Sequence, residues 1–292
     1  MSNTEESTAS VPAIVGVLGG GRMGAGIAHA FLTSGSNVTV VERDEPSAEA
    51  ARERVQKDIR ASLDRGKISG SFDAWDAKLT VSTSYADFSA CELVVEAVPE
   101  IWDLKVSSLA AVEEQLADTA WLATNTSSLS VNGLAEHLKR PERFCGLHFF
   151  NPVPASKLVE IVIAKTTGDE LRSKTLEWVA GLGKTPVTVN DAPGFASSRL
   201  GVAIALEAIR MVEEGVATPK DIDAAMVLGY KFPVGPLELT DIVGLDVRLG
   251  IAEYLEFTLG ERFAPPQLMR DMVARGELGR KSGKGFYDYS EA

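Results

Sequence analysis

The chain has 292 residues, of which 45% are hydrophobic and 24% are charged, enough for one large domain or two of medium size. Its formal net charge of −12 argues against sequence-independent binding to nucleic acid or to an anionic membrane surface. We therefore expect neither nucleic acid nor a membrane as a partner. Any phosphate-binding site has to come from a few residues rather than from the overall charge.

The first residues, MSNTEESTASVPA, are polar and acidic and lack the basic and apolar segments of a targeting signal. No later segment is an apolar run long enough to span a membrane. Cys91 and Cys145 lie in apolar stretches, which favours buried thiols of a reducing compartment over a disulfide. No Cys/His cluster has the ligand spacing of a zinc site. We expect a cytoplasmic protein with a disordered tail at residues 1–12 and no metal.

The order of apolar and glycine-rich segments predicts an α/β fold. Residues 13–18 are an apolar, β-branched run, followed by a glycine cluster, an apolar-periodic stretch with Ile27 and Phe31, and a second run at 37–41. Further apolar runs follow at 78–81, 93–98, 121–124, 144–148, 158–163 and 186–189. Helix-like segments separate several of them, which indicates a doubly wound, mostly parallel sheet.

Two helical regions stand outside this alternation. The stretch between Pro46 and Gly66 is long and highly charged, and we expect it to project from the sheet as an arm near residues 46–70. After Asp191 the strand signal nearly disappears, and helices are predicted at 200–212, 221–228, 245–259 and 266–275. This pattern divides the chain into a Rossmann-like domain at 13–191 and a helical domain at 192–292.

The helical domain carries a high apolar load, as in GVAIALEAIRMV. A second copy of the chain could cover it, which predicts a homodimer. The alternative is a self-contained bundle packed on the first domain.

The glycine cluster fits a dinucleotide-binding loop. Gly19, Gly21 and Gly24 follow a predicted strand and open a predicted helix, and Glu42 ends the next strand 18 residues after Gly24. Glu42 can accept both ribose hydroxyls and would repel a 2′-phosphate, so the pattern favours NAD over NADP. Arg43 weakens this preference slightly, and a tight turn without a ligand is the alternative reading.

One of the three histidines differs from the others. His29 and His137 are expected to be structural or solvated, whereas His148 ends an apolar strand. A turn near Pro154 would place it opposite Glu160 of the following strand, and such a carboxylate stabilises the imidazolium of a general base. A purely structural pair is the alternative.

Polar residues also follow the predicted strand at 121–124. Asn125, Thr126, Ser127 and Ser128 lie at the carboxyl edge, where ligands bind in such sheets. Ser127 or Ser128 could instead be a helix N-cap. A catalytic interpretation needs more support than this spacing gives.

That support comes from a resemblance. The segments GGGRMGAGIA, LVVEAVPE, NTSSLS, GLHFFNPVP, KLVEIV, DAPGF, DIDAAMVLGYKFPVGPLELTDIVGLD and GRKSGKGFYDY occur in this order. Together they resemble the L-3-hydroxyacyl-CoA dehydrogenase family, most closely its short bacterial 3-hydroxybutyryl-CoA dehydrogenases, over roughly residues 13–289. The resemblance implies a Rossmann-like domain followed by a helical, dimer-forming domain.

The resemblance also implies roles for individual residues. It places the catalytic histidine at His148, its partner at Glu160, the serine that bonds the substrate oxygen at Ser127, and the asparagine near the nicotinamide at Asn151. The implied NAD contacts include Ser127 and Asn151 and extend to Gly19, Gly21, Arg22, Met23, Gly24, Glu42, Glu100, Lys105 and Lys281.

The sequence departs from the family pattern at the substrate site. Ser198 stands where many members have asparagine, and it either contacts the substrate or only caps a helix or lines the domain junction. Asp58 and Arg65 stand, by an uncertain alignment, where the family has a serine and a lysine that contact CoA. An aspartate would repel the CoA phosphates, so Arg65 and Lys67 are the candidates for phosphate contact.

The implied reaction is the NAD-dependent oxidation of a (3S)-3-hydroxyacyl-CoA to the 3-oxoacyl thioester. A dehydrogenase of a hydroxy acid without CoA, such as gulonate or carnitine, is one alternative. A catalytically silent, crystallin-like NAD-binding protein is another. The acyl chain length, and whether the acyl end carries a second carboxylate, stay open.

Overall fold

The structure is a computed structural model that describes residues 10–290. The chain forms two compact units, Met1–Ala192 and Pro193–Ala292, which we call the first and the second unit. Within the described residues, no helix is long and apolar enough to cross a membrane.

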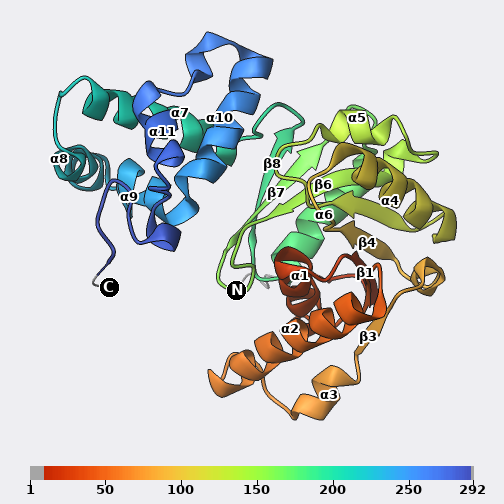
Figure 1. Cartoon of the computed structure of the whole chain (residues 1–292). Coiled ribbons are helices and arrows are strands. Elements are labelled where there is room, and N and C mark those ends of the chain that lie inside the picture. Colours follow the sequence, from red (N-terminus) through yellow and green to blue (C-terminus); the bar gives the residue numbers. More distant parts are fainter. Residues whose placement is uncertain (1–9, 291–292) are drawn as a thin grey trace, which may run out of the picture. The chain divides into compact units, whose positions relative to one another are not determined.

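The first unit contains one eight-stranded sheet in the order β3-β2-β1-β4-β5-β6-β7-β8 (Figure 1). Its strands are β1 (Ile14–Leu18), β2 (Asn37–Val41), β3 (Leu79–Ser82), β4 (Leu93–Glu96), β5 (Trp121–Thr124), β6 (Phe144–Phe149), β7 (Leu158–Ile163) and β8 (Thr185–Asn190). All neighbours pair in parallel except β6 and β7. The predicted doubly wound, mostly parallel α/β fold is confirmed.

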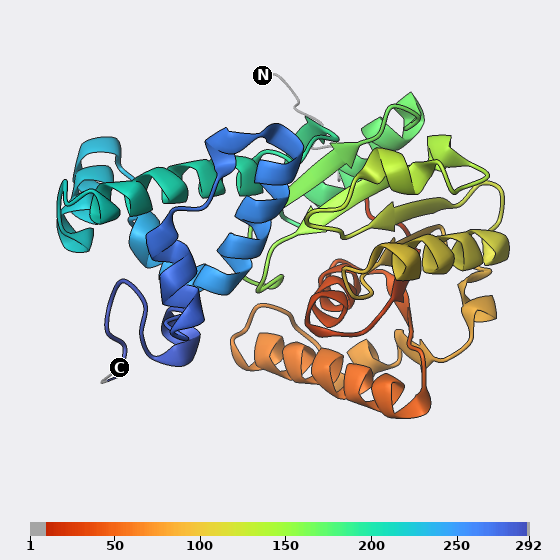
Figure 2. The ribbon, with the colours of Figure 1, turned by 45° about the horizontal axis from the view of Figure 1, so that its top comes forward.

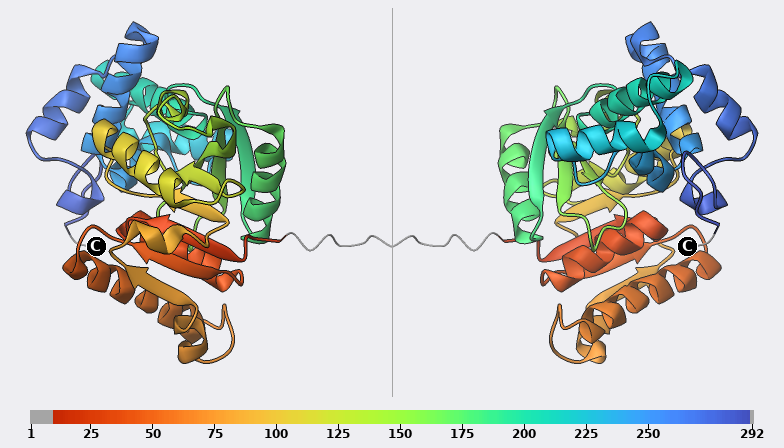
Figure 3. Two further views of the ribbon diagram at one scale, coloured as in Figure 1. Left: turned by 90° about the vertical axis from the view of Figure 1, so that its right-hand side faces the viewer. Right: turned by 90° about the vertical axis from the view of Figure 1, so that its left-hand side faces the viewer.

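Helices cover both faces of this sheet. They are α1 (Arg22–Thr33), α2 (Glu45–Asp64), α3 (Phe72–Asp76), α4 (Trp102–Gln115), α5 (Val131–Ala135) and α6 (Asp169–Gly181). Figure 3 shows α4 and α6 on opposite sides of the sheet. The central strands β4 and β5 are buried at every position, as strands covered on both faces must be.

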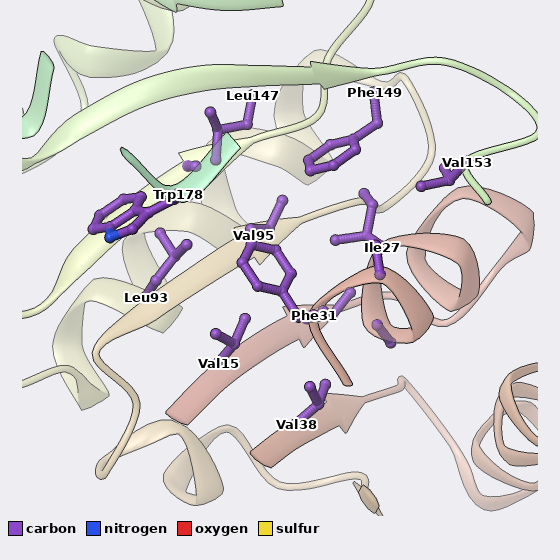
Figure 4. Packing of buried hydrophobic residues seen from close by; sticks show 14 of the residues in the cluster. Val15, Ile27, Phe31, Val38, Leu93, Val95, Leu147, Phe149, Val153 and Trp178 are labelled. Carbon is purple, nitrogen blue, oxygen red and sulfur yellow. The ribbon is translucent and has the colours of Figure 1, made fainter. Parts of the chain in front are cut away.

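The core on one face joins α1, α2 and α6 to the strands. Phe31 of α1 and Trp178 of α6 lie among strand residues such as Val15, Leu93 and Leu147 (Figure 4). Burying a side chain of this size contributes about 1.5–3 kcal/mol, which is why the apolar spacing of α1 fixes its orientation.

Helix α2 corresponds to the predicted arm, but it does not stand free of the sheet layer. Ala51, Val55 and Ile59 belong to the same buried core as α1, and the Oγ of Ser62 lies 2.9 Å from Nε2 of His29. Figure 2 shows α2 running past α1. The outer face of α2 is exposed, and so is the loop after the helix, which contains Arg65 and Lys67.

The predicted disordered tail at 1–12 is too long, because the last of these residues belong to the fold. Residues 1–9 lie outside the described part of the chain. Val11 packs against the core, and the carbonyl oxygen of the buried Pro12 accepts a 2.7 Å hydrogen bond from Ser36. The residues just before β1 are therefore part of the folded unit.

The second unit is helical. Its helices are α7 (Ser197–Glu213), α8 (Pro219–Ala224), α9 (Pro236–Val243), α10 (Leu245–Leu259) and α11 (Gln267–Ala274). They enclose a separate core that includes Leu206, Leu237 and Leu255. The sequence patterns did not predict α9, because its N-terminal cap comes from another helix: Asp223 accepts 2.8 Å hydrogen bonds from the amides of Leu237 and Glu238.

Candidate active site

The glycine loop between β1 and α1 has the geometry of an anion-binding turn. Gly19 has a φ of +89°, and a Cβ on Gly24 would lie 1.7 Å from the Gly19 carbonyl oxygen, so both positions require glycine. A Cβ on Gly21, the N-cap of α1, would meet no atom within 4 Å. The N-terminus of α1 is therefore open, and its amides and dipole favour a phosphate there.

Glu42 lies beside this loop at the end of β2. Its Oε1 accepts a 2.7 Å hydrogen bond from the amide of Gly20, and the amide of Gly19 donates to the Val41 carbonyl at 2.8 Å. Arg43 turns away, because its exposed guanidinium pairs with Asp44 at 3.0 Å. Arg43 therefore does not neutralise the carboxylate of Glu42. This carboxylate and the adjacent loop fit the adenosine ribose of NAD.

His148 and Glu160 face each other in the β6–β7 hairpin. Their Cα positions are partners in the antiparallel register, and Nδ1 of His148 lies 2.8 Å from Oε2 of Glu160. The predicted juxtaposition is confirmed. Both are buried, at 6% and 1% exposure. A carboxylate at Nδ1 keeps the ring proton on that nitrogen, so Nε2 is the basic atom.

The loop of residues 125–128 lies at the same edge of the sheet. Oδ1 of Asn125 accepts a 2.9 Å hydrogen bond from the amide of Phe149, which ties this loop to the residue after His148. Ser130, rather than Ser127 or Ser128, is the N-cap of α5, so the capping alternative for those two serines is wrong. The side chain of Ser127 is exposed.

Glu100 holds this loop in place. One oxygen, Oε1, accepts hydrogen bonds from the amides of Ser127 and Ser128, at 2.9 and 3.1 Å, and from the hydroxyls of Thr126 and Ser128. Burial raises the pKa of Glu100, but the nearby ammonium of Lys105 and these donors outweigh that effect and lower the pKa below its usual value. Glu100 is therefore ionised at neutral pH.

Lys105, expected to contact the cofactor, lies below this loop. It is only 1% exposed, and its Nζ lies 2.6 Å from Glu96 and 3.3 Å from Glu100. Sequence reasoning missed Glu96, although a carboxylate that ends an apolar strand is the same signal that identified Glu42.

A cavity of about 450 Å³ in the first unit is lined by Asn151 and by the two candidates for contact with the CoA phosphates, Arg65 and Lys67. Other lining residues include Arg22, Lys57, Asp58, Ser62 and the segment 152–155. Four cationic side chains and one carboxylate thus surround a space next to the turn that follows His148.

The remaining candidates lie in the second unit. Lys281 forms an ion pair with Asp246, with Nζ 2.6 Å from Oδ2. Ser198 is the second residue of α7, whose N-cap is Ala196. The alternative that Ser198 caps this helix is therefore wrong.

The two cysteines are free and buried, as predicted. Burial raises the pKa of both thiols to about 12, so neither is a nucleophile at neutral pH. Among residues 10–290, no three His, Cys, Asp or Glu side chains gather as a metal site would require.

Comparisons with known proteins agree with this arrangement. Residues 14–192 match the NAD-binding domain of 3-hydroxyacyl-CoA dehydrogenase, and residues 194–289 match its C-terminal domain. A 3-hydroxybutyryl-CoA dehydrogenase of Mycobacterium tuberculosis is 42% identical over 94% of this chain and 98% of its own length. A probable 3-hydroxybutyryl-CoA dehydrogenase of Deinococcus radiodurans is 40% identical over 94% of this chain and 99% of its own length.

The solved structure of (S)-3-hydroxybutyryl-CoA dehydrogenase from Ralstonia eutropha covers 96% of this chain and all of its own, with a TM-score of 0.90 and 38% identity. The glycine loop, the buried His/Glu pair and both domain matches lead to one conclusion: the chain belongs to the 3-hydroxyacyl-CoA dehydrogenase family, whose members are NAD-dependent oxidoreductases.

Proposed function

We propose that the chain oxidises a short (3S)-3-hydroxyacyl-CoA, of the 3-hydroxybutyryl type, with His148 as the general base. The observation that carries this proposal is the buried pair of His148 and Glu160, 2.8 Å apart, at the edge where the Ser127 loop is tied to β6. The names of the relatives at about 40% identity support the short acyl chain.

The reaction needs a proton and a hydride to leave the same carbinol group. His148 takes the proton of the 3-hydroxyl at Nε2, and Glu160 stabilises the imidazolium that forms. The hydroxyl of Ser127 donates to the substrate oxygen, and Asn151 would contact the nicotinamide. The chemistry supplied by NAD is the acceptance of the hydride from C3. Holding both reactants at this edge supplies much of the rate.

The cofactor is proposed to lie along the glycine loop. The amides of Gly21 to Gly24, at the start of α1, would hold the pyrophosphate, and Glu42 the adenosine ribose. Glu100 is proposed to complete the nicotinamide end.

The CoA moiety is proposed to occupy the cavity beside Asn151. Arg65 and Lys67 would pair with its phosphates, since these two cations line that cavity. Asp58 lies in the same lining and opposes them. A free hydroxy acid offers these cations one carboxylate, whereas CoA offers several phosphate charges, so a lining with four cationic side chains favours the thioester.

The base is tested by replacing His148→Gln and following NADH at its absorbance band with acetoacetyl-CoA. We expect kcat to fall by about 10²–10⁴-fold, since a general base contributes that much, while the Kd for NADH changes little. The matched control is His137→Gln, which alters an exposed histidine in contact with Trp102. Parental turnover in His148→Gln would remove this residue from the mechanism. No turnover in the parent chain would reject the proposed substrate.

A further inference from the structure

A buried carboxylate that the proposed mechanism does not use lies at the end of β4. Glu96 is the last residue of that strand and is 0% exposed. In the sheet it lies opposite Thr124 of β5, just before the loop that carries Ser127. A buried charge is unfavourable unless it is paired and hydrogen bonded, so its partners show what holds it there.

Both oxygens of Glu96 are occupied. Oε2 accepts a 2.6 Å hydrogen bond from the hydroxyl of Thr124. Oε1 accepts hydrogen bonds from Nζ of Lys105 at 2.6 Å and from the amide of Val98 at 2.7 Å. Glu96 thereby joins the ends of β4 and β5 to the first turns of α4.

Lys105 connects Glu96 to Glu100. Besides Glu96, its Nζ lies 3.2 Å from the carbonyl oxygen of Val98 and 3.3 Å from Oε2 of Glu100. An ammonium has three N–H groups, and these three oxygens match them in number. The ammonium therefore orients the carboxylate of Glu100 and has no further donor to offer a ligand in this arrangement.

Glu100 connects the network to the proposed substrate contact. Its Oε2 faces Lys105, while its Oε1 accepts hydrogen bonds from the backbone amides of Ser127 and Ser128. A continuous path of polar contacts thus runs from Glu96 through Lys105 and Glu100 to the backbone of Ser127.

We propose that Glu96 is a positioning residue that sets the location of Ser127 through Lys105 and Glu100. This inference rests on the proposed role of Ser127. It also gives Lys105 an indirect role, in place of the direct cofactor contact that the family resemblance implies. Glu96 touches neither reactant, and its effect is on where the Ser127 hydroxyl meets the substrate oxygen.

The test compares two isosteric changes of buried carboxylates. Glu96→Gln removes the charge that holds Lys105. The matched control is Glu113→Gln on helix α4, which also carries Lys105. Glu113 is 6% exposed, accepts hydrogen bonds from the amides of Lys139 and Arg140, both at 2.8 Å, and its Oε1 lies 3.8 Å from Nε of Arg140. Both variants should lower Tm, since each loses a buried ionic contact. Only Glu96→Gln should lower kcat, by about tenfold or more, because a shift of about 1 Å at a reacting group can cost about 100-fold.

A double variant shows whether the effect passes through Ser127. If it does, Glu96→Gln should add less than about twofold to the loss already caused by Ser127→Ala, since coupled sites are not additive. Parental kcat in Glu96→Gln, or losses that multiply in the double variant, would overturn the positioning role while leaving the site intact. Parental kcat in Ser127→Ala would instead overturn the proposed role of Ser127, on which this inference rests, and leave His148 as the proposed base.

Glu96→Asp provides a second route if Glu96→Gln does not fold. It keeps the negative charge of the buried pair but shortens the side chain by one methylene group, which withdraws the carboxylate from Lys105 and Thr124. A fall in kcat that disappears in the Ser127→Ala background supports the inference, and an unchanged kcat overturns it.

Discussion

At the scale of single residues, we expect Glu42 to determine which dinucleotide fits. Its carboxylate accepts a 2.7 Å hydrogen bond from the amide of Gly20 and therefore lies directly beside the loop proposed for the pyrophosphate. A hydrogen bond to a charged group contributes about 1.5–3 kcal/mol, and a 2′-phosphate at the same place would be repelled. Glu42→Ala should therefore lower kcat/KM for NAD by about 10–100-fold and leave or raise the value for NADP.

The measurement is kcat/KM for both cofactors with one substrate. The matched control is Glu45→Ala, which removes an exposed carboxylate three residues further along, in the first turn of α2. An unchanged NAD to NADP ratio in Glu42→Ala, or the same change in both variants, would assign the preference to another residue.

The sequence revealed the pair whose geometry follows from the alternation of two strands joined by a turn. His148 and Glu160 sit on two strands joined by one turn, so alternation and turn chemistry were enough to pair them. The Glu96–Lys105 pair was not predicted, because it depends on how α4 returns to the sheet after β4. The role of Ser198 as a cap was wrong for a related reason: α7 begins at Ser197, after Ala196 as its N-cap, so Ser198 is already inside the helix.

At the scale of elements, the end of α2 and the loop that follows it determine how a CoA phosphate would bind. Arg65 is the C-cap of α2, and both Arg65 and Lys67 are exposed. An exposed ion pair contributes about 0.2–1 kcal/mol, so Arg65→Gln and Lys67→Gln should each raise KM for the acyl-CoA by roughly 1.5- to 5-fold. Asp58→Ser should lower KM, because it removes the only carboxylate among the residues described as lining the cavity.

These effects should shrink as salt is added, since exposed charges are screened. KM measured at low and high ionic strength checks this, and Lys139→Gln serves as the control, since its side chain is 74% exposed and pairs with Glu114 on another part of the unit. Equal effects in Lys139→Gln, or KM values without salt dependence, would argue that the CoA phosphates bind elsewhere.

Strands were predicted more accurately than helices at this scale. The apolar runs located all eight strands, and the signal is clearest for central strands such as β4 and β5, because a strand buried on both faces needs an uninterrupted apolar sequence. Helix α9 was missed, since its N-terminal amides are capped by Asp223 from α8 rather than by a neighbouring residue. The length of α2 was predicted, but the side chains that anchor it on α1 were not identified.

At the scale of the whole molecule, the second unit exposes large apolar side chains that a monomer would leave in water. Phe257 is 90% exposed, Tyr230 74% and Leu228 72%. We propose a homodimer that buries this surface, and a stable dimer typically buries about 800 Å² per partner. Light scattering at micromolar concentration should give twice the chain mass, and Phe257→Ser should weaken the association.

Leu176→Ser is the control for this change, because Leu176 is an apolar residue of α6 in the first unit that is 44% exposed. A monomeric parent chain would contradict the proposal. Dissociation of the Leu176→Ser variant alone would place the interface on the first unit instead.

The hairpin that carries His148 and Glu160 also affects the order in which the parts of the active site form during folding. These residues are 12 positions apart in the chain, whereas Gly20 and Glu42 are 22 apart and Glu96 and Thr124 are 28 apart. Short loops cost less entropy to close, and an isolated hairpin forms in about 1–10 μs. We therefore expect a folding chain to pair its base with its carboxylate before it can hold a dinucleotide. Activity then appears only with the last contacts to form, so a partly folded chain does not carry out the reaction.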